Sequence, residues 1–257
     1  MAVSPTATNK PVIVLVHGAW QRPAQYESLK QGLAGRGFSV LQPESATSGT
    51  VIAELRGKTY LDDVAVIREA IEEPLAAGKE VILVCHSYGG IPASAAAEGY
   101  QVHERREQGL PGGIKHIMYL AAFAFPAKGL SLLKAIGGSY APFMNKEGDV
   151  IALGEGAKDA LFNDCDSETA DRLLAGAIYQ SSASFETPTT FAAADVVVPK
   201  TYVVCEEDHA LPLDAQLAMV DALGNVTEVR VRSGHCVHLN TELLPKVLDA
   251  IETAAGF

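Results

Sequence analysis

A serine within a run of small residues is the first group in this sequence that could do covalent chemistry. Ser87 lies in the stretch CHSYGG at 85–90, after a β-branched apolar run and before an alanine-rich segment. A strand, a tight turn and a helix in this order form a nucleophile elbow, which presents the serine hydroxyl at the N-terminus of the helix. The G-x-S-x-G pattern is incomplete because Cys85 stands at its first position. The alternative is an ordinary serine that caps a helix.

A carboxylate and a histidine follow in the chain order that would activate this serine. A hydroxyl is a poor nucleophile without a base, and His235 follows the last β-branched run of the sequence. His238 competes with it, as a residue near the substrate or as a merely structural histidine. Asp208 precedes His235 by enough residues for one helix and one strand, and we predict that it orients the second ring nitrogen of His235. The two glutamates before Asp208 are expected to be solvated.

Two backbone N–H groups could stabilise the oxyanion that forms when the serine attacks a carbonyl. Tyr88 follows the nucleophile and offers one of them. Ala19, in the stretch HGAW after the first apolar run, offers the other. Gly18 lets this loop turn freely, and Trp20 is expected to form a wall of the pocket mouth, so both are candidate substrate contacts. The alternative for this stretch is a plain glycine turn.

Six short apolar runs alternate with helical patterns. The best of these runs are continuous rather than alternating, which is typical of strands buried on both faces of a parallel sheet. Strand alternating with helix predicts an α/β fold with a mostly parallel, six-stranded, doubly wound sheet. Ligands bind beyond the C-terminal ends of such strands, where the candidate residues also fall. The strands are expected at 12–16, 38–41, 81–85, 114–120, 201–205 and 227–231, and the helices at 24–34, 61–77, 89–98, 212–223 and 241–254.

One long segment breaks this alternation. Residues 126–196 contain no clear strand, and they include a helical pattern at 167–178. About 70 residues are too many for a structureless loop inside a compact domain. We therefore expect an inserted helical subdomain within a single domain that spans 1–257. Phe123 and Phe125, just before the segment, are candidate pocket residues or core residues. Further aromatic candidates inside it are Phe143, Phe162, Tyr179 and Phe185.

The charge balance excludes some classes of partner. The 257 residues include 20 Lys and Arg against 31 Asp and Glu, a formal net charge of −11, and 48% are hydrophobic. Nucleic acids and anionic membranes require basic surfaces, so neither is expected as a partner. The longest purely apolar run has about nine residues, whereas a membrane span needs about 20.

The N-terminus and the cysteines indicate where the protein works. Met1 to Lys10 has no basic start and no apolar stretch, so we expect a short arm rather than a secretory signal, and a cytoplasmic protein. The four cysteines form no CxxC pair and no Cys/His metal spacing. Reduced thiols are expected, with no metal and no cofactor.

These motifs resemble those of the α/β-hydrolase superfamily. The resemblance is carried by HGAW at 17–20, HSYGG at 86–90, Asp208 with Leu211-Pro212 and Gln216, and Gly234-His235. Within the superfamily the chain is similar, from about Val12 to its C-terminus, to the compact branch of plant methylesterases and hydroxynitrile lyases.

The resemblance implies roles for the candidate residues. Ser87 would be the nucleophile, His235 the base and Asp208 its partner, with the N–H groups of Ala19 and Tyr88 as the oxyanion hole. Residues 126–196 would form a lid over the pocket. Members of this branch often dimerise, so a homodimer is compatible with the resemblance.

Two positions favour hydrolysis over cyanohydrin cleavage. Cys236 stands where cyanogenic lyases of this branch carry a lysine, and Gly18 fits the esterase pattern better than the threonine of those lyases. The sequence predicts a serine hydrolase that cleaves a small, neutral carboxylic ester or lactone through an acyl-enzyme on Ser87. One alternative is a carbon–carbon bond hydrolase, lyase or cyclase of secondary metabolism with the same triad. The other is a ligand receptor without catalysis.

Overall fold

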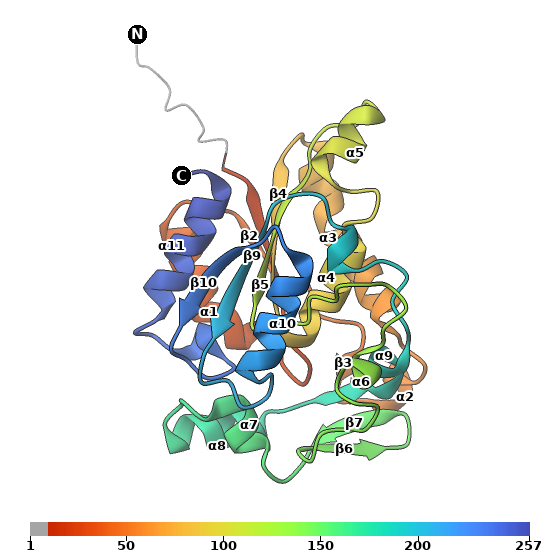
Figure 1. Ribbon diagram of the computed structural model, residues 1–257, viewed down its shortest axis with the longest axis vertical. Helices are drawn as coiled ribbons and strands as arrows, with labels where there is room; N and C mark the ends of the chain where they lie inside the picture. Colours follow the sequence, from red (N-terminus) through yellow and green to blue (C-terminus); the bar gives the residue numbers. More distant parts are fainter. Residues whose placement is uncertain (1–9) are drawn as a thin grey trace.

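A parallel β-sheet forms the centre of the computed structural model, which describes residues 10–257 (Figure 1). Its six strands stand in the order β10-β9-β5-β4-β1-β2, and all five neighbouring pairs are parallel. The predicted six-stranded α/β sheet is thus confirmed. Residues 1–9, for which the sequence predicts an arm, lie outside the described residues. The strands of this sheet are β1 (Val12–Val16), β2 (Val40–Leu41), β4 (Glu80–His86), β5 (Gly113–Leu120), β9 (Lys200–Cys205) and β10 (Thr227–Val231).

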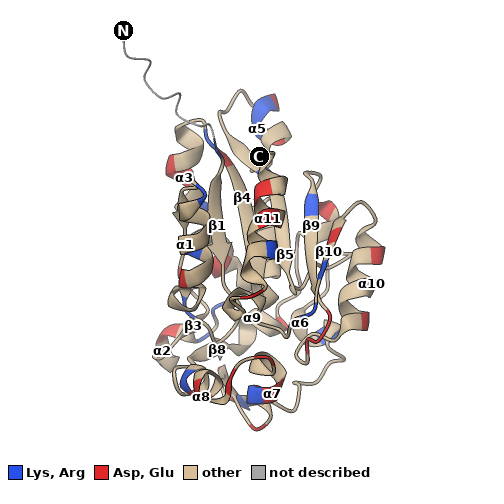
Figure 2. Cartoon of the chain, turned by 90° about the vertical axis from the view of Figure 1, so that its left-hand side faces the viewer, with Lys and Arg blue, Asp and Glu red and all other residues tan. Residues whose placement is uncertain are grey.

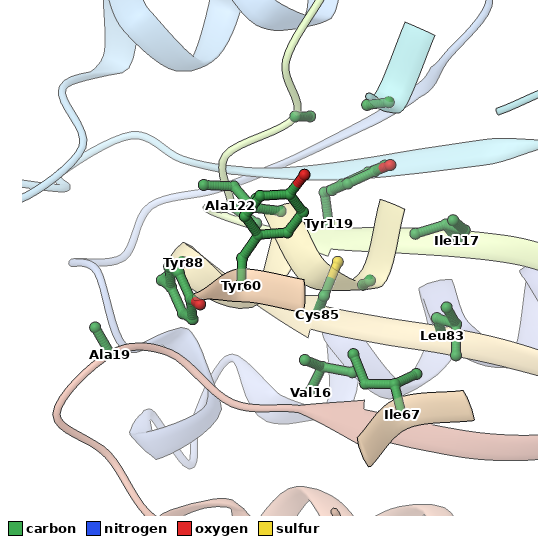
Figure 3. Packing of buried hydrophobic residues seen from close by; sticks show 14 of the residues in the cluster. Val16, Ala19, Tyr60, Ile67, Leu83, Cys85, Tyr88, Ile117, Tyr119 and Ala122 are labelled. Atoms are coloured by element: carbon green, nitrogen blue, oxygen red, sulfur yellow. The ribbon is translucent and has the colours of Figure 1, made fainter. Parts of the chain in front are cut away.

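Helices cover both faces of the sheet, which explains why strands such as β1 and β4 are continuous apolar runs in the sequence. Along β1, Ile13 belongs to one buried cluster together with Leu29 of α1, whereas Val16 belongs to a second cluster together with Ile67 of α3. Figure 3 shows this second cluster, with Val16, Leu83 and Ile67 packed between the strands and the helix. The helices on the first face are α1 (Glu27–Gly35) and α11 (Leu244–Ala255), and those on the second are α3 (Tyr60–Ala76), α4 (Gly90–Ala96) and α10 (Leu213–Leu223).

The remaining short helices connect these layers. Phe38 is not part of β2, although the sequence predicts a strand from 38; it lies in the turn after α1 and is buried. The connecting elements outside residues 126–196 are α2 (Ile52–Leu55), α5 (Val102–Glu107) and the 3-10 turns η1 (Pro23–Tyr26), η2 (Ser87–Gly89) and η4 (Val237–Leu239).

The segment 126–196, called the insertion below, contains strands as well as helices. The expectation of a helical insertion with no clear strand is therefore right about the helices and wrong about the strands. Three of its strands form a four-stranded antiparallel sheet with a short strand from the loop after β2, in the order β3-β8-β7-β6. These strands are β3 (Ser48–Gly49), β6 (Met144–Glu147), β7 (Val150–Leu153) and β8 (Tyr179–Ser181). The helices of the insertion are α6 (Leu132–Ala135), α7 (Ala157–Phe162), α8 (Ser167–Ala175) and α9 (Ser182–Glu186), with the 3-10 turn η3 (Ala193–Asp195).

The strands of the insertion are hard to recognise because they are short and partly polar. β6 has the sequence MNKE, three of its four residues are exposed, and it occupies the edge of its sheet. It therefore shows neither apolar alternation nor a β-branched run, the two signals of a strand. Gly148, at φ 61°, forms the turn that joins β6 to β7.

Most of the insertion, including α7, α8, β6 and β7, lies beyond the C-terminal ends of the parallel strands, at the bottom of Figure 1. Charged residues lie mainly on the outer helices and loops in the view of Figure 2. Within residues 10–257 no helix combines the length and the apolar character that a bilayer crossing requires.

Candidate active site

Ser87 occupies a strained turn between β4 and α4. Its φ is 53°, in the left-handed region that non-glycine residues rarely adopt. Glycines allow the chain to pack closely here, because a Cβ on Gly89 would lie 2.7 Å from the carbonyl oxygen of His17, and one on Gly90 would lie 2.4 Å from that of Phe123. This geometry is that of a nucleophile elbow rather than of an ordinary helix cap.

Cys85 replaces the first glycine of the elbow pattern without disturbing the turn. Its side chain is fully buried in the sheet core (Figure 3), and its thiol donates to the carbonyl oxygen of Met118 at 3.2 Å. Burial raises the pKa of this thiol, so it remains protonated. Cys85 acts here as a small core residue.

His235 and Asp208 form a buried hydrogen-bonded pair. Nδ1 of His235 lies 2.7 Å from Oδ2 of Asp208, and both side chains are almost inaccessible to solvent. The other carboxylate oxygen, Oδ1, accepts the N–H groups of Ala210 and Leu211, at 2.8 Å each. The carboxylate is thus fixed on one side by backbone donors and presents its second oxygen to the imidazole, as an orienting acid does.

Gln216 holds the loop that carries Asp208. Its fully buried amide donates to the carbonyl oxygens of Leu211 and Cys205, at 2.7 and 3.0 Å, and accepts the N–H of Cys205 at 3.0 Å. Glu207 instead pairs with Arg232 at the surface. Of the three consecutive carboxylates, the fold therefore brings Asp208 to the histidine.

Ser87 and His235 border the same cavity, which has a volume of about 560 Å³. Ala19 and Tyr88, the predicted oxyanion donors, border it as well. Among the described residues no hydrogen bond joins the Ser87 hydroxyl to the His235 ring, and such catalytic contacts often tighten only when substrate is bound.

The cavity wall is mostly apolar, and among the described residues no Lys, Arg, Asp or Glu side chain lines it. Trp20, Phe123 and Phe125 line it, as expected, whereas Phe162 and Tyr179 do not. The other lining residues are Pro126, Leu130, Leu132, Ala135, Ile136, Ala141, Phe143, Met144, Leu161, Phe185, Ala210, Leu211, Pro212, Ala215, Ala218 and Met219. Most of them belong to the insertion or to α10.

Comparison with known proteins places the chain in a family. The model of the alpha/beta hydrolase family matches residues 13–244. This chain is an α/β hydrolase. It is 32% identical over 256 residues to the alpha/beta hydrolase nvfD of Aspergillus novofumigatus, covering 96% of this chain and 97% of that protein.

Two further similarities agree with the compact methylesterase-like branch. The hydrolase is 26% identical over 243 residues to salicylic acid-binding protein 2 of Nicotiana tabacum, covering 85% of this chain and 87% of that one. A methylesterase from Arabidopsis, MES16, shares its fold with a TM-score of 0.70 at 17% identity, covering 95% of this chain and 99% of that one. The resemblance seen in the sequence is confirmed.

Trp20 connects the first loop of the hydrolase to the insertion. Its indole Nε1 donates to the carbonyl oxygen of Ile151 in β7 at 2.9 Å, and its ring packs edge-on against Phe143 and Phe185. Trp20 also has a positive φ of 61°, which turns the chain after Ala19. The wall of the pocket is thus tied to the loop that carries a predicted oxyanion donor.

Gly18 and His238 lie outside the cavity lining, so the structure does not support them as substrate contacts. Gly18 allows the loop after β1 to lie close to Ser87, because a Cβ at this position would lie 3.1 Å from the Cβ of Ser87. His238 is fully buried and stacks on Tyr26 with 3.9 Å between ring centroids. Burial lowers the pKa of His238 to about 3, so this ring is a neutral packing group.

Two residues of the insertion that no sequence motif selects hold both loops of the acid–base pair. Oδ2 of Asp164 accepts the Ser233 hydroxyl at 2.8 Å and the Gly234 N–H at 2.9 Å, immediately before His235. Nδ2 of Asn163 donates to the carbonyl oxygen of Glu207 at 2.8 Å, immediately before Asp208. The insertion therefore positions the pair as well as lining the cavity.

The described part of the chain offers no cluster of three or more His, Cys, Asp or Glu side chains arranged to bind a metal ion.

Proposed function

We propose that this hydrolase cleaves neutral carboxylic esters or lactones through an acyl-enzyme on Ser87. The observation that carries the proposal is the 2.7 Å contact between His235 and Asp208, at the edge of the apolar cavity that Ser87 also borders. An oriented, buried imidazole beside a serine in an elbow is the arrangement that serine esterases require.

The proposed reaction has two halves, acylation of Ser87 and hydrolysis of the acyl-enzyme, and the same side chains and N–H groups act in both. Nε2 of His235 takes the proton of the Ser87 hydroxyl as its oxygen bonds to the substrate carbonyl carbon, and the oxyanion is stabilised by the N–H groups of Ala19 and Tyr88. The imidazolium then protonates the alcohol oxygen as its bond to the carbonyl carbon breaks. Water attacks the acyl-enzyme by the same steps, releasing the acid and restoring the serine.

The cavity wall supports an uncharged substrate. Within residues 10–257 no Lys, Arg, Asp or Glu lines the cavity, and burying a charge without a partner is costly. The volume falls within the range of roughly 300–1,000 Å³ that is usual for pockets of drug-sized ligands. The tobacco relative is named for binding salicylic acid, an anion at neutral pH, but this wall offers no cation to pair with a carboxylate.

Turnover of ester substrates tests the proposal. We expect wild-type protein to hydrolyse p-nitrophenyl butyrate, and Ser87→Ala or His235→Ala to lower kcat by a factor on the order of 10⁶. Circular dichroism and thermal unfolding of the variants should match the wild type. Wild-type turnover in Ser87→Ala would contradict the proposal.

A substrate panel distinguishes the alternative reactions. If β-diketones or cyanohydrins were cleaved and esters were not, and both Ser87→Ala and His235→Ala abolished that cleavage, carbon–carbon chemistry would replace ester hydrolysis. If the protein bound ligands tightly but cleaved nothing, a receptor function would replace both.

A further inference from the structure

His86 connects the loop of the base to the loop of the oxyanion donor. It is the last residue of β4, directly before Ser87, and it is fully buried outside the cavity lining. Its Nε2 lies 2.9 Å from the carbonyl oxygen of His235, and its Nδ1 lies 2.7 Å from the hydroxyl of Tyr26. The Tyr26 oxygen in turn accepts the N–H of Gly18 at 3.0 Å. One imidazole thus joins three loops.

The chemistry of the partners fixes where the proton of His86 lies. A carbonyl oxygen can only accept, so Nε2 carries the proton that it shares with His235. Burial, with the neighbouring His235 and His238 adding to it, holds the pKa of His86 well below its usual range, so the ring is neutral. Its Nδ1 must then accept, and the Tyr26 hydroxyl is the donor within reach. The same hydroxyl also donates to Oε1 of Gln21, so its single proton is shared between Gln21 and His86.

These contacts restrain His235 at a point that Asp208 does not reach. Asp208 holds the imidazole through Nδ1, whereas His86 holds the backbone carbonyl of the same residue. Together they determine where Nε2 of His235 stands relative to Ser87. A misplacement of about 1 Å at such a group can cost roughly 10²-fold in rate.

On its other side, His86 is connected through the Tyr26 hydroxyl to the loop that carries the predicted oxyanion donor. Gly18 immediately precedes Ala19, whose N–H is the predicted donor to the oxyanion, and the hydroxyl of Tyr26 fixes the Gly18 peptide. The loop of His235 and the loop of Ala19 are therefore both held by the buried ring of His86, the second through Tyr26.

We propose that His86 is a positioning residue for acyl transfer, which holds the His235 backbone over Ser87 and is itself oriented by Tyr26. The inference rests on the proposed function, because it concerns the efficiency of that same reaction. Since His86 and Tyr26 lie outside the cavity lining, their loss should lower kcat and leave KM unchanged.

A matched pair of substitutions separates the two hydrogen bonds of His86. The amide nitrogen of glutamine can reach the position of Nε2, whereas that of asparagine reaches only the position of Nδ1. We expect His86→Gln to keep most of the wild-type kcat for p-nitrophenyl butyrate. His86→Asn should lose roughly 10- to 100-fold in kcat with KM unchanged.

Tyr26→Phe tests the other end and keeps the ring that packs in the core. It should lower kcat in the same direction with KM unchanged, because Nδ1 of His86 and the N–H of Gly18 both lose a partner. Tyr119→Phe is the control, since Tyr119 is equally buried and its hydroxyl pairs with Ser94 in the sheet core. Its kcat should match the wild type.

The outcomes separate this inference from the proposed function. An active wild type, with unchanged kcat in His86→Asn and Tyr26→Phe, would overturn the positioning role alone. The positioning role would also be overturned by a second set of results. In that set, His86→Gln and His86→Asn lose kcat equally and both unfold at a lower temperature, while Tyr26→Phe keeps the wild-type kcat. A wild type that neither hydrolyses esters nor reacts with a fluorophosphonate would overturn the proposed function, and this inference with it.

Discussion

Asp208 differs from its acidic neighbours in what its two oxygens contact. One accepts the N–H groups of Ala210 and Leu211, and the other faces Nδ1 of His235, whereas Glu207 pairs with Arg232 at the surface. Of the three carboxylates, Asp208 is therefore the one placed to set the tautomer of His235.

Asp208→Asn should lower kcat by a factor on the order of 10⁴, less than the loss in Ser87→Ala, because Asp208 orients the base and does not itself react. Steady-state hydrolysis of p-nitrophenyl butyrate measures this. Glu207→Gln is the matched control and should retain wild-type kcat. A severe loss in Glu207→Gln with a mild one in Asp208→Asn would show that the acid is misassigned.

Ala218 gives a test of the cavity as the substrate site. It lines the cavity from α10, and Ala218→Phe should narrow that space. We expect kcat/KM for p-nitrophenyl decanoate, divided by kcat/KM for p-nitrophenyl acetate, to fall about tenfold or more. The reason is that each methylene of the acyl chain excluded from an apolar pocket costs about 1–3 kcal/mol. Ala222→Phe, at an exposed position on the same helix outside the lining, should leave the ratio unchanged. An unchanged ratio in Ala218→Phe would place the acyl chain elsewhere.

Residue types and chain order were enough to select Ser87, Asp208 and His235, because the ends of parallel strands meet at one edge of a sheet. They were not enough for His86 or Tyr26. His86 stands inside the elbow motif, but a buried histidine shows its partners only after folding brings residues far apart in the chain together. The sequence leaves the role of His238 open for the same reason, since its spacing from His235 does not show that it stacks on Tyr26.

At the scale of elements, the turn after α7 joins the insertion to both loops of the acid–base pair. Asp164 accepts two hydrogen bonds from the residues immediately before His235, and Asn163 donates to the residue before Asp208. The insertion should therefore influence the rate of the reaction as well as the choice of substrate.

Asp164→Ala should lower the free energy of unfolding by about 1.5–3 kcal/mol, because it leaves two donors of the His235 loop without their charged acceptor. It should also lower kcat more than it changes KM. Urea unfolding and steady-state kinetics measure the two effects. Asp171→Ala removes an exposed ion pair with Lys158 in the same insertion and should change stability by less than about 1 kcal/mol. Equal effects of the two substitutions would contradict the role of Asp164.

The strands of the parallel sheet are predictable from the sequence, as is α8 at the helical pattern 167–178, whereas the strands of the insertion are not. Strands buried on both faces, such as β4 and β5, appear as apolar runs in the sequence. β6 and β8 have four and three residues and owe their conformation to partners in the antiparallel sheet. One of those partners, β3, comes from outside the insertion, and a local pattern cannot show such a pairing.

At the scale of the whole molecule, a buried network around Asp63 joins the core to the insertion. The Asp63 carboxylate accepts the hydroxyls of Tyr88 and Thr47, at 2.6 Å each, and the Thr47 hydroxyl accepts the amide of Gln180 at 2.8 Å. Burial raises the pKa of Asp63 to about 6 from an ordinary value of 3.8, although the hydrogen bonds from Thr47 and Tyr88 oppose the shift.

This shift predicts the sign of a pH dependence. A carboxyl with a raised pKa binds its proton more tightly in the folded state, so its stabilising contribution is complete below pH 3.8 and is lost as the pH rises through about 6. The unfolding free energy of the wild type minus that of Asp63→Asn should therefore fall by up to roughly 3 kcal/mol from pH 4 to pH 7. Urea unfolding at each pH measures it. A difference that stays constant or rises would contradict the raised pKa.

The overall charge and the charge of the cavity are independent properties of this hydrolase. The net charge of −11 belongs to the chain as a whole, whereas no Lys, Arg, Asp or Glu among residues 10–257 lines the cavity. The proposal of an uncharged substrate rests on the cavity wall. The acidic residues beside Asp208 add nothing to it, because Glu206 and Glu207 pair with Arg230 and Arg232.

The central claim is that Ser87 is a nucleophile activated by His235. Intact-protein mass spectrometry after treatment with a fluorophosphonate tests it most directly, because the reagent bonds to an activated serine. We predict that wild-type protein gains the mass of one phosphonyl group, that peptide mapping locates this group on Ser87, and that Ser87→Ala gains none. A wild type without an adduct, or an equal adduct in Ser87→Ala, would contradict the claim.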